Sequence, residues 1–176
     1  MKKGFTLVEI LVSLGIFIVI MTSSLGAMTG ILTASNKARS LRTAMDTLNV
    51  SLETMSREIR FGTKYHCSVT SGTITDPRNC STGANSISFL SSDNEQISYR
   101  YRNSGIERSI NGSAYVPVTG SGIDITGLRF YVFGTTVGDT QQPNVVLVIR
   151  GHAGTTTGNK ADFNLETYIS QRKIDK

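Results

Sequence analysis

The sequence predicts an α+β fold in which one long N-terminal α-helix packs on a C-terminal antiparallel β-sheet domain. Three observations lead to this prediction. Residues 5–32 form an apolar run in which Glu9 is the only charged side chain and no proline occurs. Residues 36–61 carry apolar side chains at helical spacing. After Ser86 the apolar side chains instead alternate with polar ones, as they do in strands.

The apolar run is long enough to span a membrane. Its 28 residues, at a helical rise of ~1.5 Å each, would extend roughly 42 Å, against a hydrocarbon core of ~30 Å. Lys2 and Lys3 precede the run. Since basic flanks stay in the cytoplasm, we expect a single-pass protein whose C-terminal domain lies outside it.

Three interpretations of this segment compete. A secretory signal has an apolar core of about 7–15 residues and a small-residue cleavage site; this run is longer, and Leu25-Gly26-Ala27 is a weak site. A plain membrane anchor explains everything except Glu9, because a carboxylate inside the apolar zone costs about 2.5–3.5 kcal/mol on insertion scales. The third interpretation gives the carboxylate a task.

That interpretation comes from a resemblance at the N-terminus. The residues concerned read Gly4-Phe5-Thr6-Leu7-Val8-Glu9. They resemble the cleavage motif of type IV prepilins and type II secretion pseudopilins, in which a dedicated peptidase cuts after the glycine and methylates the new amino terminus. The resemblance implies a leader over residues 1–4, cleavage between Gly4 and Phe5, and N-methylation of Phe5. It also implies that Glu9 neutralises the amino terminus of a neighbouring subunit during assembly.

The resemblance implies partners and a location as well. The partners are other pilin or pseudopilin subunits, the prepilin peptidase and an inner-membrane assembly platform. The location is the bacterial inner membrane, and a cell-envelope filament after assembly. Residues 52–60 and the closing strand predicted over residues 163–172, in this order, also resemble the larger, J-class minor pseudopilins and related minor pilins.

Gly26 and Gly30 form a Gly-x-x-x-Gly pair in the outer part of the apolar run. Such a pair allows close packing against another helix. Glycine is also simply commoner in membrane helices than in soluble ones, and the sequence leaves both interpretations open. Many pilins carry a helix-breaking proline in this region, which this chain lacks.

Residues 33–62 are predicted to form an amphipathic helix that continues the apolar one to Phe61, with Gly62 as its stop. A coiled coil has the same apolar spacing, but under three heptads is short for one, so we expect packing on a sheet. Opposite charges four residues apart, Arg42 with Asp46 and Glu53 with Arg57, support the helix. The apolar stripe consists of Leu41, Met45, Leu48, Leu52, Met55 and Ile59.

Residues 63–85 are predicted to be a loop because Ser, Thr, Gly, Asp and Pro dominate them. Cys67 and Cys80 lie within it. Since this part is expected outside the cytoplasm, we predict a disulfide closing a 14-residue loop, worth ~3 kcal/mol. Free or metal-binding thiols are the alternative, but only His66 is near enough to add a ligand.

Residues 86–176 are predicted to be the β-sheet domain. A turn at residues 103–105 separates two alternating runs and predicts a hairpin. Residues 115–118 suit a short edge strand because Pro117 cannot donate a ladder hydrogen bond. The continuous apolar run 145–149 predicts a central strand covered on both faces. Further alternating runs begin at Ile87, Leu128 and Phe163.

No catalytic motif appears, and no cofactor or metal site is predicted. The formal charge of +5, or +3 without Lys2 and Lys3, is small and scattered, so nucleic-acid binding is not expected. The sequence therefore predicts a non-enzymatic structural subunit, a minor pilin or pseudopilin of a type IV pilus, type II secretion system or related filament. The alternative is a single-pass, membrane-anchored extracytoplasmic binding module that does not polymerise.

Overall fold

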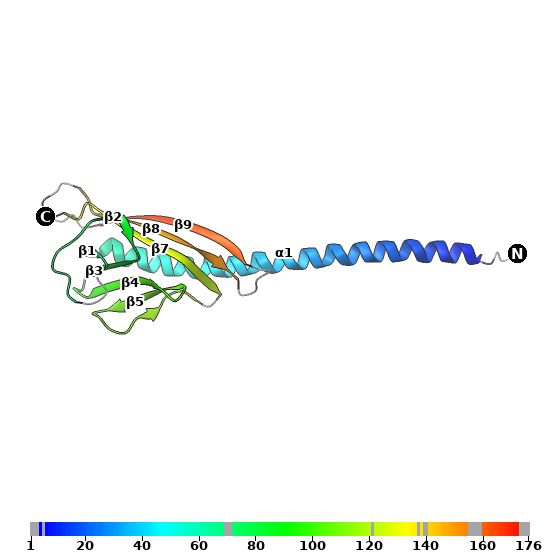
Figure 1. Ribbon diagram of the computed structural model, residues 1–176, viewed down its shortest axis with the longest axis horizontal. Helices are drawn as coiled ribbons and strands as arrows, with labels where there is room; N and C mark the ends of the chain where they lie inside the picture. Colours follow the sequence, from blue (N-terminus) through cyan, green and yellow to red (C-terminus); the bar gives the residue numbers. More distant parts are fainter. Residues whose placement is uncertain are drawn as a thin grey trace. The chain divides into compact units, whose positions relative to one another are not determined.

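The computed structural model describes residues 4, 6–68, 72–120, 122–136, 138, 141–154 and 160–172. It confirms the α+β fold: one helix, α1 (Leu7–Phe61), is followed by strands in two antiparallel sheets (Figure 1). The chain divides into two compact units, Met1–Arg39 and Ser40–Lys176.

The first unit contains residues 7–39 of α1, and every one of these side chains is exposed. Sixteen large apolar side chains between Leu7 and Leu32 are each at least 47% exposed. In the described part of the chain, α1 is the one helix whose length and composition suit a membrane crossing. So much exposed apolar surface is unfavourable in water, so this unit needs lipid or other protein around it.

The second unit contains the rest of α1 and both sheets. The five-stranded sheet has the order β1 (Thr63–Cys67), β3 (Ser86–Leu90), β4 (Gln96–Arg102), β5 (Gly105–Ile110) and β6 (Val116–Pro117). The four-stranded sheet has the order β2 (Cys80–Ala84), β7 (Ile123–Phe133), β8 (Asn144–Ala153) and β9 (Ala161–Ser170).

The apolar stripe of α1 faces the sheets, as predicted. Leu48, Met55 and Ile59 are completely buried in the core with the inward side chains of both sheets. The other three stripe residues are partly buried against the same core. Ala44 is buried as well, although the stripe did not include it. Of the two expected charge pairs, the structure shows the ion pair between Glu53 and Arg57.

The end of α1 is fixed by Gly62 and by the side chain of Tyr65. The Tyr65 hydroxyl lies 2.6 Å from the carbonyl oxygen of Ile59 and 3.0 Å from that of Gly62, so its single hydrogen is shared between two carbonyls at the end of the helix. A Cβ at Gly62 would lie 2.5 Å from Cδ2 of Phe89. Glycine is therefore required here by crowding.

The prediction of a loop over residues 63–85 is wrong at both ends, where β1 and β2 form. Both strands are only five residues long and mostly polar, so neither shows the apolar alternation on which the prediction relied. β1 is the edge of the five-stranded sheet and β2 the edge of the four-stranded one.

The hairpin prediction is confirmed by β4 and β5, which pair from Arg102 with Gly105 onward. Asn103 and Ser104 form the two-residue turn, with φ of 50° and 55°, the left-handed values that a type I′ turn needs. The short edge strand is also confirmed, as β6.

The prediction that residues 145–149 are covered on both faces is wrong. They lie in β8, between β7 and β9, and Val145, Leu147 and Ile149 are buried against the core. Val146 and Val148, on the other face, are only half-buried. In the part of the chain that the structure describes, this second face is therefore open.

Candidate functional site

Thr6 is the N-cap of α1. Its hydroxyl oxygen accepts a hydrogen bond from the backbone N–H of Glu9 at 3.3 Å, and its carbonyl oxygen accepts one from the N–H of Ile10, also at 3.3 Å. Thr6 and Glu9 thus have the spacing of a capping box, in which an acidic or amide side chain three residues after the cap favours the helix start. Sequence reasoning treated Glu9 only as a charge in an apolar run and missed this local role, although the spacing is visible in the sequence.

Glu9 is exposed in the first turn of α1. The helix N-terminus carries partial positive charge, so a carboxylate is favourable there. Among the described residues, no side chain forms an ion pair with Glu9. The backbone N–H of Glu9 is therefore bound to the cap, while its carboxylate has no counter-charge among the described residues.

Gly4 is exposed, and a Cβ placed on it would meet no atom within 4 Å. The chain itself therefore gives no packing reason for glycine at this position. Phe5, the residue expected to be methylated, lies outside the described residues.

The polar side chains inside the apolar run are satisfied by the helix itself. Each hydroxyl between residues 13 and 29 donates to the backbone carbonyl oxygen three or four residues before it; Ser13 and Ser24, for example, do so at 2.8 Å. In lipid, an unsatisfied hydrogen-bonding group costs several kcal/mol. These serines and threonines are therefore compatible with an apolar surrounding.

Gly26 and Gly30 lie on this same exposed helix. A Cβ on either would meet nothing within 4 Å, so no contact inside the chain requires glycine there. The structure leaves room for another helix to approach closely, but it does not test the prediction that one does.

The predicted disulfide between Cys67 and Cys80 is present, with the two Cα atoms 6.2 Å apart. Cys67 ends β1 and Cys80 begins β2, so the bond ties the edges of the two sheets together. The loop between them is held by further contacts: the Ile74 N–H donates to Oε1 of Gln96 at 3.0 Å, and Ile74 is buried.

A second polar cluster, missed by sequence reasoning, joins α1 to the five-stranded sheet. Arg108 donates to both carboxylate oxygens of Glu58, at 2.7 and 3.1 Å, and the Tyr99 hydroxyl donates to Glu58 at 2.6 Å. These residues are 41 and 50 positions away from Glu58, so no local pattern could have predicted the cluster.

The charges of this cluster shift two pKa values. Burial, and then the hydrogen bond to Glu58, raise the pKa of Tyr99 above its usual range. Burial alone would lower the pKa of Arg108, but the hydrogen bond and charge of Glu58 outweigh it and raise that pKa. Tyr99 is therefore a neutral donor and Arg108 a permanent cation at physiological pH.

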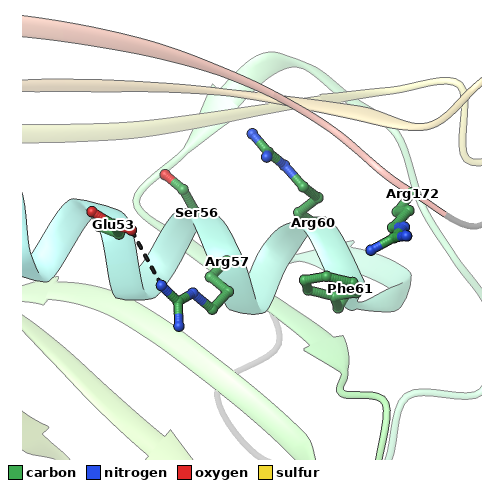
Figure 2. A pocket seen from close by; sticks show the side chains of 6 residues that line it. All are labelled: Glu53, Ser56, Arg57, Arg60, Phe61 and Arg172. Atoms are coloured by element: carbon green, nitrogen blue, oxygen red, sulfur yellow. Dashed lines mark hydrogen bonds and ion pairs between the residues drawn. The ribbon is translucent and has the colours of Figure 1, made fainter.

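The C-terminal end of α1 borders a hollow of about 660 Å³ that is rich in arginine. Figure 2 shows that its guanidinium groups point in different directions: Arg57 is paired with Glu53 below the helix in this view, and Arg60 points to the opposite side. Arg172 lies 5.4 Å from the centre of the Phe61 ring. The three cations do not converge on one point, so the hollow is a cationic surface and not a formed anion site.

Residues 1–25 match the family model of the prokaryotic N-terminal methylation motif. No curated protein and no solved structure matches the chain. The match covers residues 1–4, the cap and the first part of α1, and none of the sheet domain.

Proposed function

We propose that this chain, whose residues 1–25 match the N-terminal methylation motif, is a type IV pilin-like protein and a minor structural subunit of an envelope filament. The observation that supports this most directly is the conjunction of that motif with a helix whose apolar side chains are all exposed between residues 7 and 32. Such a helix suits lipid before assembly and other helices after it.

In this proposal, a prepilin peptidase removes residues 1–4 and methylates the new amino terminus of Phe5. Glycine at position 4 has no packing role among the described residues, so its requirement would come from the peptidase, which must approach the backbone closely. The cut leaves an α-amino cation at the start of an apolar helix.

Glu9 would neutralise that cation on an adjacent subunit. An unpaired charge is costly in an apolar medium, and removal of one partner leaves the other uncompensated. Glu9 is exposed and lacks a counter-charge among the described residues. Its carboxylate is therefore free to serve a neighbour while its backbone N–H remains bound to the cap.

The neighbours would be other pilin or pseudopilin subunits, delivered by an inner-membrane assembly platform. The sheet domain would lie outside the cytoplasm, where the disulfide between Cys67 and Cys80 persists. Close helix contacts at Gly26 and Gly30 would complete the filament core. We further propose that the chain has no catalytic activity of its own, and that it belongs with the J-class minor pseudopilins or their minor-pilin relatives.

The decisive experiment separates the two roles that Glu9 can play. Glu9→Gln removes the charge but keeps a side chain that suits the capping box. Glu9→Leu removes both the charge and the capping side chain. Both variants are expressed in cells with an active peptidase and assembly machinery. We expect both to be cut after Gly4 and inserted in the membrane, and both to be excluded from sheared or detergent-extracted filaments.

Intact mass gives the processing state and co-purification gives incorporation. If Glu9 serves only as a cap, the Gln variant will be incorporated and the Leu variant will not. Incorporation of the Leu variant at parental levels would overturn the role of Glu9. A parent protein whose mass still includes Met1–Gly4 would instead indicate the membrane-anchored binding module.

A further inference from the structure

The outer face of the four-stranded sheet carries two matched rows of side chains. In the first row, Tyr131 on β7, Val146 on β8 and Tyr168 on β9 stand opposite one another. In the second row, Arg129 on β7, Val148 on β8 and Glu166 on β9 stand opposite one another. Residues opposite each other on antiparallel strands project from the same face, and the other face of these strands is buried.

These rows are more apolar than an open face requires. An antiparallel strand with one wet face usually alternates apolar and polar side chains, yet Val146 and Val148 continue the apolar run of β8 outward. Tyr168 is 64% exposed. Tyrosine and arginine are also the residues that are enriched where proteins meet. Tyr131, Val146, Val148 and Tyr168 therefore form an apolar and aromatic patch on an outer face whose neighbouring positions are polar or charged.

We propose that the face binds the same face of a second copy of this chain, around a two-fold axis that runs along β8. This rotation places β7 of each copy over β9 of the other. Arg129 then meets Glu166 of the second copy, and the reverse pair forms at the same time. Tyr131 meets Tyr168 of the second copy. Val146 meets Val146 of the second copy, and Val148 meets Val148.

The charges select this axis. A two-fold axis perpendicular to the strands would instead place each row over the other, with the Glu166 carboxylate against Tyr168 and Arg129 against Tyr131. Both charges would then be desolvated without a counter-charge, which is unfavourable. Only the axis along β8 pairs both charges and both aromatic positions in one self-complementary contact.

The orientation also suits chains held in one membrane. β7, β8 and β9 run along residues 40–61 of α1 (Figure 1). An axis along β8 therefore leaves the two copies of this helical segment pointing in the same direction, as two chains anchored by the same end require.

The contact is small. Three strands about 4.8 Å apart and two rows about 7 Å apart along the strands give a face of roughly 200 Å² per copy, which is less than a stable interface needs. Arg150 lies next to Val148 on the outer face of β8, close to the axis, so the two copies of this cation repel each other. The pair therefore depends on the high local concentration that anchoring to a membrane provides.

The test uses the full chain in liposomes with Val148→Cys. Because Cys67 and Cys80 are bonded to each other, the new thiol is the one free thiol of the chain. A short bifunctional maleimide should join two copies through it. Ser92→Cys, an exposed position on a loop of the other sheet, is the control and should give little product.

Charge reversal makes the test specific. In the Val148→Cys background, Arg129→Glu should lower the yield of cross-linked dimer at least about tenfold, because like charges then face each other twice. Adding Glu166→Arg should restore it, and Arg150→Gln alone should raise it. Equal cross-linking at positions 148 and 92, or failure of the double reversal to restore the yield, would overturn the proposal.

In cells, a cross-linked product whose mass is not twice that of the chain would show a different occupant, and would also overturn it. This inference goes beyond the proposed function and does not depend on it. Replacement of Glu9 should leave the cross-linking yield unchanged, so the two proposals fail separately.

Discussion

The contact between Glu58 and Arg108 should contribute far more to stability than the ion pair that is its neighbour on the helix. Arg108 makes two hydrogen bonds to Glu58, and the two side chains are only 22–26% exposed. Glu53 and Arg57 are 70–73% exposed and joined by one contact of 3.2 Å. We expect Arg108→Met to lower the free energy of unfolding by about 2–3 kcal/mol, because it leaves the carboxylate poorly solvated without its cation. Arg57→Met should cost at most about 0.5 kcal/mol.

A double-mutant cycle isolates the interaction. Glu58→Leu combined with Arg108→Met removes both charges, so it should cost less than the two single losses added together, with a coupling of about 1.5–3 kcal/mol. Unfolding is followed by pulse proteolysis in urea, with the full chain in detergent micelles. If the single losses simply add, or if the exposed pair costs as much as the buried one, the contact does not hold the helix on the sheet as described.

Two further predictions concern the same domain. Since the pKa of Tyr99 is raised in the folded state, the unfolded state loses this proton first, so stability should fall from about pH 10 upward by about 1.4 kcal/mol per pH unit. The free energy of unfolding of Tyr99→Phe, measured with urea between pH 9 and 11, should fall less steeply with pH, by about 1.4 kcal/mol per pH unit above pH 10. The same pH dependence in the variant and the parent would contradict a raised pKa of Tyr99. Thiol labelling of the denatured, unreduced protein should find neither Cys67 nor Cys80, and replacement of both by serine should lower the free energy of unfolding by ~3 kcal/mol.

The sequence predicted those features that are encoded by neighbours in the chain. Helical spacing identified the stripe of Leu48, Met55 and Ile59, and the turn residues Asn103 and Ser104 identified a hairpin. These signals are local, because a helix face and a tight turn are each specified within a few residues.

The features that the sequence did not predict depend on partners far away in the chain. β1 and β2 are short and polar, and they form strands because each makes backbone hydrogen bonds to a longer-range partner, β1 to β3 and β2 to β7. The cluster around Glu58 needs a helix and two strands to meet. The helix start is different. Thr6 and Glu9 are only three residues apart, so their capping spacing is visible in the sequence, but the sequence analysis considered only the charge of Glu9.

Two surfaces with exposed apolar side chains are not buried by the described residues, and they suit different surroundings. Residues 7–32 expose apolar side chains around the whole helix, a surface that lipid satisfies without any specific geometry. The outer face of β7, β8 and β9 places Arg129 and Glu166 on either side of a valine, and lipid would leave both charges unpaired. A protein with the opposite order of charges would pair both of them. A two-fold axis along β8 supplies that order from the chain itself, which is why we propose a second copy of the chain on the sheet, and lipid followed by other subunits around the helix.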